Sequence, residues 1–301
     1  MAANLKEVRD RISSIASTKQ ITKAMKMVSA AKLRRAQQAI VKMRPYSVKQ
    51  NSMLSNIVSN LSGEVEISYA VERQETNVLI VVVTSNRGLC GAFNSFINKE
   101  AVKLVENKYA AQRKSRNLTM MFVGKKGYEY FKSRYKDINF ITDNVGLFED
   151  LSFSNTALVS QAIMDSFDDK TYDKIEVAYG EFKNAAVQYY KTEQFLPIQK
   201  VEPETVETDS TGGQNALFIF EPSADQLLKH MVPSILKTQF HKYLLDTHAS
   251  EHGARMTAMA KATDNADDLL KELKIDYNKA RQEAITREIS EIVGGVAALE
   301  G

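Results

Sequence analysis

Two histidines near the C-terminal end of the chain have the spacing of a metal-binding helix. The segment His248–His252 reads HASEH and matches the zinc-peptidase pattern H-x-x-E-H. Two histidines four residues apart on a helix can share one metal ion. A catalytic zinc also needs a third protein ligand, and no downstream acid is marked out by its spacing. We therefore expect a surface or coiled-coil helix here, and no metal.

The loop Thr84–Asn94, TSNRGLCGAFN, follows an expected strand and precedes an expected helix, where phosphate-binding loops occur. It lacks the Gly-Lys-Ser/Thr ending of a P-loop, and Gly88 and Gly91 do not form G-x-G-x-x-G, so we expect neither nucleotide nor other cofactor. Cys90 needs a nearby histidine to be a nucleophile, and all four histidines lie in the C-terminal region. A small buried cysteine is the favoured interpretation.

A basic helix is expected at Thr18–Gln37, TKQITKAMKMVSAAKLRRAQ, where Lys19, Lys23 and Lys26 share one face. Like charges at this spacing destabilise an isolated helix by roughly 0.2–0.5 kcal/mol per pair. Residues 11–63 contain ten Lys or Arg and no acid. Such a face requires an acidic partner, a phosphate polymer or water.

Nucleic-acid binding is the main alternative for this basic region, as a helical adaptor that tracks phosphates. Tyr46 is the only aromatic residue there that could stack on a base, and no named nucleic-acid-binding motif is present.

Both ends of the chain have the apolar spacing of long helices. In the first, Leu5, Val8, Ile12 and Ile15 form a coiled-coil seam, and Ile21, Met25 and Val28 are expected to resume it after a slip. Pro45 is expected to bend or interrupt this helix, and Pro233 to kink or restart the second. The second helix has two apolar stripes: Met259, Ala262, Ala266, Leu269 and Leu273, then Ile285, Ile289, Ile292, Val296 and Leu299.

Between the two helices the pattern changes to alternating strands and helices, which predicts a partly parallel α/β sheet. Strands are expected at 77–83, 118–124, 138–142, 174–182, 185–198 and 216–220, and helices at 93–112, 125–135 and 155–167. The segment 202–215 is expected to be an exposed loop, and Ser223 and Gln226 form a capping-box pattern. The expected domains are 1–70, 71–220 and 221–301. The terminal helices could pair antiparallel with each other, or their seams could face other chains.

Composition sets the remaining bounds. The 301 residues are 44% hydrophobic and 26% charged, which is ordinary for a globular protein. The single cysteine excludes an internal disulfide and is typical of a reducing, intracellular compartment. No signal peptide is visible, and the longest strongly apolar run, Val78–Val83, is too short to cross a bilayer.

Three blocks together resemble one family over essentially the whole chain. They are Arg11–Gln37, Thr84–Asn94 and Ser250–Leu299. In order and spacing they resemble the gamma subunits of F-type ATP synthases of the bacterial type. The sequence departs from the family in having Asn86 where Asp is usual and Ala92 where Gly is usual, which weakens any inference about that loop.

The resemblance implies a fold with an antiparallel coiled coil of the two terminal helices and a Rossmann-like α/β domain between them. It implies a non-catalytic rotor without bound nucleotide, which couples proton flow through a membrane c-ring to ATP synthesis or hydrolysis at the beta subunits. The implied partners are three alpha and three beta subunits, the epsilon subunit and the c-ring. The implied location is peripheral, on the cytoplasmic face of the bacterial plasma membrane.

The resemblance also implies which residues contact the ring of alpha and beta subunits. Lys23, Met25 and Lys26 are expected to face the beta subunits, including their acidic lever loop. The other expected contacts are Arg255, Gln282, Thr286 and Arg287 along the ring, and Ile292, Val296 and Leu299 in an apolar bearing.

Overall fold

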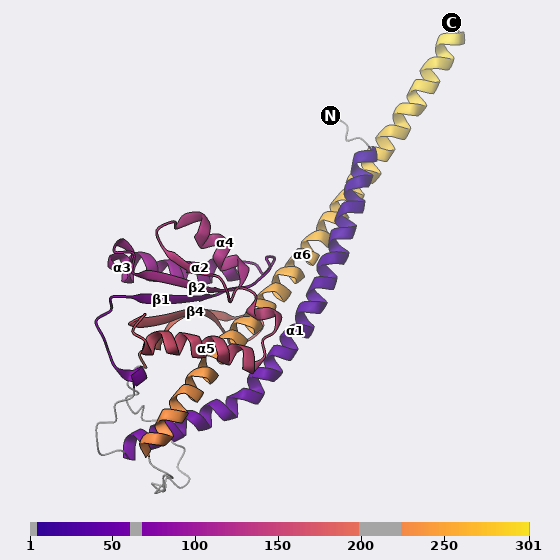
Figure 1. Cartoon of the computed structure of the whole chain (residues 1–301). Coiled ribbons are helices and arrows are strands. Elements are labelled where there is room, and N and C mark those ends of the chain that lie inside the picture. The colour runs from indigo at the N-terminus through magenta and orange to yellow at the C-terminus, as the bar shows by residue number, and fades with distance from the viewer. Residues whose placement is uncertain (1–4, 61–67, 199–223, 301) are drawn as a thin grey trace. The chain divides into compact units, whose positions relative to one another are not determined.

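A computed structural model describes residues 5–60, 68–198 and 224–300 of the chain (Figure 1). By their contacts the residues divide into two compact units. One unit combines Met1–Ala30 with Arg255–Gly301, and the other is Ala31–Ala254. The expected strand 216–220, the acidic loop 202–215 and Ser223 of the expected capping box lie outside the described residues. The expected domain boundaries stay a prediction.

Two long helices, α1 (Leu5–Asn60) and α6 (Ala224–Glu300), confirm the expected helical ends of the chain. Pro45 lies inside α1 and Pro233 inside α6, and neither proline ends its helix. Of the alternatives expected at these prolines, the interruption at Pro45 and the restart at Pro233 therefore do not occur, and a bend or kink stays a prediction. In the part of the chain that the structure describes, no helix is apolar over a length sufficient to span a bilayer.

The second unit contains a five-stranded sheet in the order β3-β2-β1-β4-β5. Strands β1 to β4 are parallel where they pair, and β5 is antiparallel to β4, so the expected partly parallel sheet is confirmed. The strands are β1 (Val78–Val83), β2 (Leu118–Val123), β3 (Asn139–Ile141), β4 (Lys174–Phe182) and β5 (Gln188–Leu196).

Helices cover both faces of this sheet (Figure 1). They are α2 (Phe93–Lys103), α3 (Ala110–Lys114), α4 (Lys125–Arg134) and α5 (Phe153–Asp168), with a π-helical turn at Leu104–Lys108 and 3-10 turns at Ser68–Ala70 and Leu147–Glu149. The expected helix 93–112 is thus divided, because the π turn shifts the backbone register after Lys103.

Strand β1 shows why the domain has three layers. Its six residues are all buried, so both of its faces need cover. Leu79, Val81 and Val83 pack in one core with residues of α5 and α6. The alternate residues of the strand pack in a second core with residues of α2 and α4. The two cores arise from the two-residue period of the strand.

Candidate partner-binding surface

The first unit is a pair of antiparallel helices formed by the N-terminal part of α1 and the C-terminal part of α6. Side-chain hydrogen bonds between described residues join them: Arg9 Nη2 to the Tyr277 hydroxyl at 2.9 Å, Lys19 Nζ to Asp267 Oδ1 at 2.6 Å, and Thr263 Oγ1 to Thr22 Oγ1 at 2.8 Å. Residue numbers rise along α1 as those of their partners fall along α6. The expected antiparallel pairing is therefore confirmed.

The buried face of α1 in this pair follows a strict seven-residue repeat. Val8, Ile15, Thr22 and Ser29 are seven residues apart, and all are buried or half-buried. A seven-residue repeat keeps one face of a helix turned toward its partner. The polar side chain of Thr22 is tolerated in this seam because it accepts a hydrogen bond from Thr263. The seam therefore continues through polar residues without any slip.

This seam corrects part of the prediction that Ile21, Met25 and Val28 resume the coiled-coil contact. Met25 is half-buried, as Ile15 is, but Ile21 is 60% exposed and Val28 is 57% exposed. Because Ile21 and Val28 are seven residues apart, they form a separate apolar row on the outer face of α1. The prediction was wrong for these two residues because it followed the apolar residues. Continuing the seven-residue step from Val8 would have found the seam.

The matching seam of α6 needs a smaller correction. Met259 and Ala266 are buried, and Leu273 continues the same seven-residue step half-buried. Leu269, which was assigned to this stripe, is 46% exposed, and Leu270 is the leucine that turns inward. A shift of one residue along a helix turns the side chain by about 100° around its axis. This turn is enough to move a side chain from the seam to the solvent-exposed face.

The three stacked lysines of α1 separate into two roles. Lys19 donates to Asp267 of α6 and belongs to the helix pair. This hydrogen bond holds the pKa of Asp267 below its ordinary value. Lys23 and Lys26 are exposed, and the structure gives neither an ion pair among the described residues. Two of the three charges therefore remain available to another molecule.

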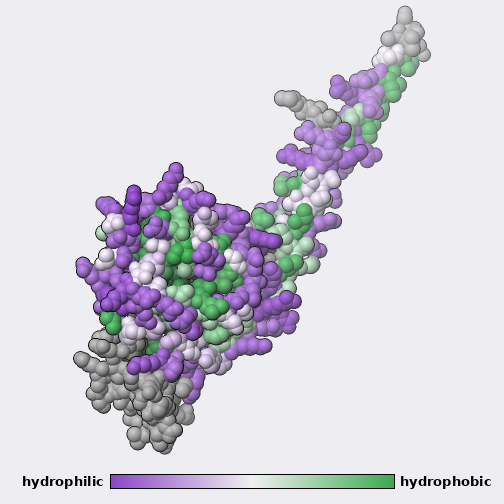
Figure 2. Space-filling model, viewed as in Figure 1, coloured by the Kyte–Doolittle hydropathy of each residue, from purple (hydrophilic) through white to green (hydrophobic). Residues whose placement is uncertain are grey.

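The C-terminal end of α6 is an exposed amphipathic helix. Gln282, Thr286 and Arg287 are exposed, and Arg287 Nε lies 3.3 Å from Glu291 Oε1 within the same helix. Ile292 is 66% exposed and Val296 is 51% exposed. Figure 2 shows apolar residues in green along one side of this end and polar residues in purple along the other.

The apolar side of this end continues over several turns through Ile285, Ile289, Ile292 and Val296. Leu299 has no described side chain. Exposed apolar stripes of this kind are typical of surfaces that bind another protein.

Arg255 differs from the other expected contact residues, because it is only 7% exposed. Lys23 and Lys26 are exposed and Met25 is half-buried within about one turn of α1, while Gln282, Thr286 and Arg287 are all exposed within two turns of α6. At about 100° per residue, Met25 points away from Lys23 and Arg287 away from Thr286, so neither set gathers on a single face. The assignment of all ten residues to contacts with the ring stays a prediction.

The loop after β1 is filled by its own side chains. Asn94 Nδ2 donates to Cys90 Sγ at 3.2 Å and to Ser85 Oγ at 2.8 Å, and Cys90 is buried, as expected. Gly124 closes the loop from the β2 side at φ 100°, and an added Cβ would lie 2.0 Å from the Thr84 carbonyl oxygen. In sheets of this type ligands bind at the carboxyl ends of the strands where the strand order reverses, here between β1 and β4. The packing of this loop gives no sign of such a ligand.

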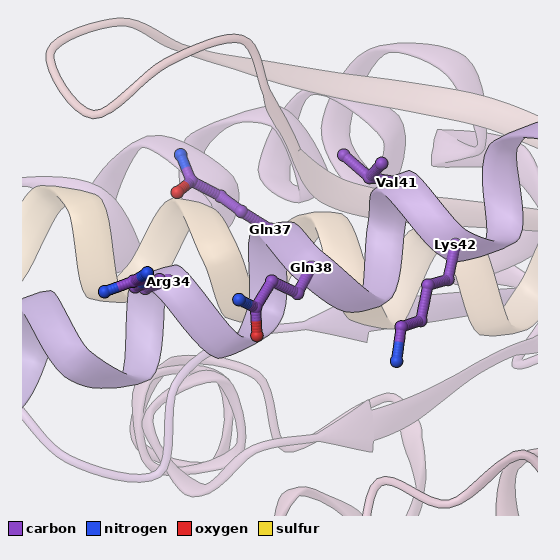
Figure 3. A pocket seen from close by; sticks show the side chains of 5 residues that line it. All are labelled: Arg34, Gln37, Gln38, Val41 and Lys42. Carbon is purple, nitrogen blue, oxygen red and sulfur yellow. The ribbon is translucent and has the colours of Figure 1, made fainter.

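A shallow hollow on α1 is lined by Arg34, Gln37, Gln38, Val41 and Lys42 (Figure 3). All five side chains come from adjacent turns of one helix. Walls from a single helix cannot enclose a small molecule, and small-molecule sites are normally concave and bury most of their ligand. We therefore assign no ligand to this hollow.

The H-x-x-E-H segment lies in the second unit, on α6. Nε2 of His252 and Nε2 of His248 are 3.1 Å apart, so the two rings converge. Among residues 5–60, 68–198 and 224–300 there is no cluster of three or more His, Cys, Asp or Glu that could hold a metal ion. A catalytic zinc site has no third ligand in this part of the chain.

One buried carboxyl group has a strongly altered pKa. Asp246 of α6 is buried, and this burial raises its pKa to about 7. Glu181 and Glu193 raise the pKa further, while Lys242 and Arg44 oppose them. A carboxyl group with this pKa is about half protonated at neutral pH.

Comparison with known proteins places these features in one family. The family model described as ATP synthase matches residues 4–299. The ATP synthase gamma chain of Cytophaga hutchinsonii is 50% identical over 296 residues, which cover 98% of this chain and 99% of that one. The gamma chain of Christiangramia forsetii is 48% identical over 299 residues, with 99% and 100% covered.

Solved structures give the same fold at lower identity. A chain of the Euglena gracilis mitochondrial ATP synthase, in a structure of OSCP, F1 and c-ring, has a TM-score of 0.66 at 22% identity, with 98% of this chain and 94% of that one covered. A chain of the Tetrahymena thermophila central stalk and c-ring has a TM-score of 0.53 at 22% identity, with 80% and 99% covered.

Proposed function

Because this chain belongs to the gamma-chain family of the F-type ATP synthases, we propose that it is the central-stalk rotor of such an enzyme. It turns inside a ring of three alpha and three beta subunits. This rotation couples proton flow through the c-ring to ATP synthesis or hydrolysis at the beta subunits. The observation that carries the proposal is the outer surface of the helix pair, where charge and apolar side chains are exposed on helices already paired with each other.

A rotor acts by contacting the conformations of each catalytic site differently. A shaft can shift a catalytic site from one conformation to another only if it binds one of those conformations more tightly than the other. Lys23 and Lys26 offer long, mobile charges to an acidic surface, and Ile21 and Val28 offer small apolar contacts on another side of the same turns. Such contacts are individually weak, so each can form and break once per turn.

The C-terminal end of α6 supports a second part of this proposal. Ile292 and Val296 expose apolar surface at the end of a helix, as an apolar bearing requires. Gln282, Thr286 and Arg287 precede them and contact the ring along its length. Arg255, which is nearly covered, acts at the other end of this helix segment.

The remaining partners are the epsilon subunit and the c-ring, with the chain held peripherally at the cytoplasmic face of the bacterial plasma membrane. Contact with the membrane is through the c-ring alone. The chain itself is non-catalytic, and the filled loop after β1 supports a role without bound nucleotide. The nucleic-acid-binding alternative has no support among the relatives described above, which are ATP synthase gamma chains.

Copurification tests the proposal directly. Affinity purification of the tagged chain from its native membranes is expected to yield alpha and beta subunits in three-fold excess, and ATP hydrolysis that drives proton pumping. Recovery of the chain with nucleic acid and without alpha and beta subunits would reject the assignment.

A further inference from the structure

Two imidazole rings of α6 face each other within the second unit. The Nε2 atoms of His248 and His252 are 3.1 Å apart, with ring centroids at 4.5 Å and ring planes at 86°. At this distance one Nε2–H can donate to the other Nε2, and the tautomers decide which ring is the donor. Residues four apart lie one above the other on a helix, so the backbone itself holds the two rings together.

A residue outside the helix orients one of the rings. Phe148, from the 3-10 turn Leu147–Glu149, stacks on His248 with centroids at 5.9 Å and planes at 17°. Phe148 itself packs against the core shared by the sheet, α5 and α6. His252 is buried and His248 is partly exposed, so the pair is ordered yet within reach of solvent.

We propose that His248 and His252 form a two-ligand site for a borderline divalent transition-metal ion such as Zn²⁺, Ni²⁺ or Cu²⁺. The two Nε2 atoms are 3.1 Å apart, so one ion can bind both of them through metal–nitrogen bonds of about 2.0–2.1 Å. The N–metal–N angle is then about 100°. That angle lies between the octahedral and tetrahedral values. Imidazole nitrogen selects these ions over Mg²⁺ and Ca²⁺, which prefer oxygen.

Binding requires one change of tautomer and no net proton release from a neutral pair. The ring that donates from Nε2 must move this proton to Nδ1 so that both Nε2 lone pairs can bind the ion. Within the described ranges there is no group of three or more His, Cys, Asp or Glu that could hold a metal ion, so the proposed site has two protein ligands. The site is therefore suited to reversible metal binding that holds one turn of α6 in place. This metal binding is separate from the proposed rotor function.

The test uses the untagged full-length chain, freed of metal by a chelator and dialysis. Zn²⁺ is titrated by calorimetry, and Co²⁺ serves as a spectroscopic probe of nitrogen ligation. The wild type is expected to bind one ion per chain, with no response to Mg²⁺. His248→Gln is expected to lose at least tenfold in affinity. His230→Gln, which changes an exposed histidine of the same helix, is the matched control and is expected to bind like the wild type.

A second measurement separates binding from folding. Zn²⁺ is expected to raise the melting temperature of the wild type and of His230→Gln, because an ion that binds only the folded state stabilises it. It is expected to leave His248→Gln unchanged. Because His252 is buried, its replacement can weaken folding, so the partly exposed His248 decides the test. Equal Zn²⁺ affinity in His248→Gln and wild type, or no binding by the wild type, would overturn the proposal.

Discussion

Lys19 of α1 donates to Asp267 of α6 across 2.6 Å, and this contact joins two residues that are 248 positions apart in the chain. The sequence places Lys19 in a row with Lys23 and Lys26, as one of three equivalent charges. The structure gives it a different role from the other two, because its carboxylate partner lies within the same chain.

Asp267→Asn is expected to lower the melting temperature slightly near neutral pH, and less so at high salt, because exposed ion pairs are weak and screened. The pKa of Asp267 is lowered in the folded state, so its stabilisation is present above the ordinary pKa of 3.8 and is lost as pH falls below it. Melting curves at pH 7 and pH 3 measure the effect. Asp268→Asn, which breaks only a contact within α6 to Lys271, is the control and should keep the helix pair intact.

Charge reversal at Lys23 and Lys26 together, to Glu, is expected to uncouple proton flow from ATP synthesis while the complex still assembles. Both side chains are exposed, so the helix pair does not depend on them. Proton-driven ATP synthesis in membrane vesicles is the measurement. The same charge change at Lys132 and Lys136 of the α/β domain serves as the control. Normal synthesis by the Lys23/Lys26 variant would contradict the proposed contact.

Ile21→Ser combined with Val28→Ser is expected to change the stability of the free chain by less than about 0.5 kcal/mol per site, because both residues are exposed. Met259→Ala, in the buried seam, is expected to cost about 2 kcal/mol or more. Chemical denaturation measures both.

The same Ile21/Val28 variant is expected to weaken retention of the chain by the alpha and beta subunits. Gel filtration of the reconstituted complex measures retention. A large loss of stability in the free chain would instead show that Ile21 and Val28 pack in the seam of the helix pair.

Asp246→Asn is expected to stabilise the chain at pH 8 and to have little effect at pH 4. The pKa of Asp246 is about 7 when folded and 3.8 when unfolded, so wild-type stability contributed by this group is present below pH 3.8 and is lost as pH rises to about 7. The upper limit of the gain is about 4 kcal/mol, from 1.36 kcal/mol per pKa unit. Denaturation at the two pH values measures it, with the exposed Asp143→Asn as control. An equal effect at both pH values would show that burial does not hold the proton.

The elements of the α/β domain could be predicted closely from the sequence. The valine-rich run that becomes β1, and the runs that become β2 and β4, carry strand propensity and burial in consecutive residues. The run that becomes β5 is only partly buried and is rich in strand-forming residues. The division of the helix after Lys103 could not be predicted, because a π turn depends on local packing rather than on apolar period.

The candidate surface was predicted less well than the elements that carry it. Family resemblance indicated Lys23, Lys26 and the C-terminal apolar stripe, and the structure leaves these side chains exposed wherever it describes them. The apolar row of Ile21 and Val28 was missed because it was assigned to the seam. Apolar character does not distinguish a residue that packs within the chain from one kept for a partner.

The sequence by itself determined that two long helices enclose an α/β domain and that the first helix is strongly basic, because periodicity and charge are local properties of the chain. Only the tertiary structure decided which face of each helix packs against the other helix. A seam holding Thr22 opposite Thr263, and Lys19 opposite Asp267, is stabilised by pairing between residues more than 240 positions apart. Such pairing satisfies polar groups that look like surface residues until the partner helix is in place.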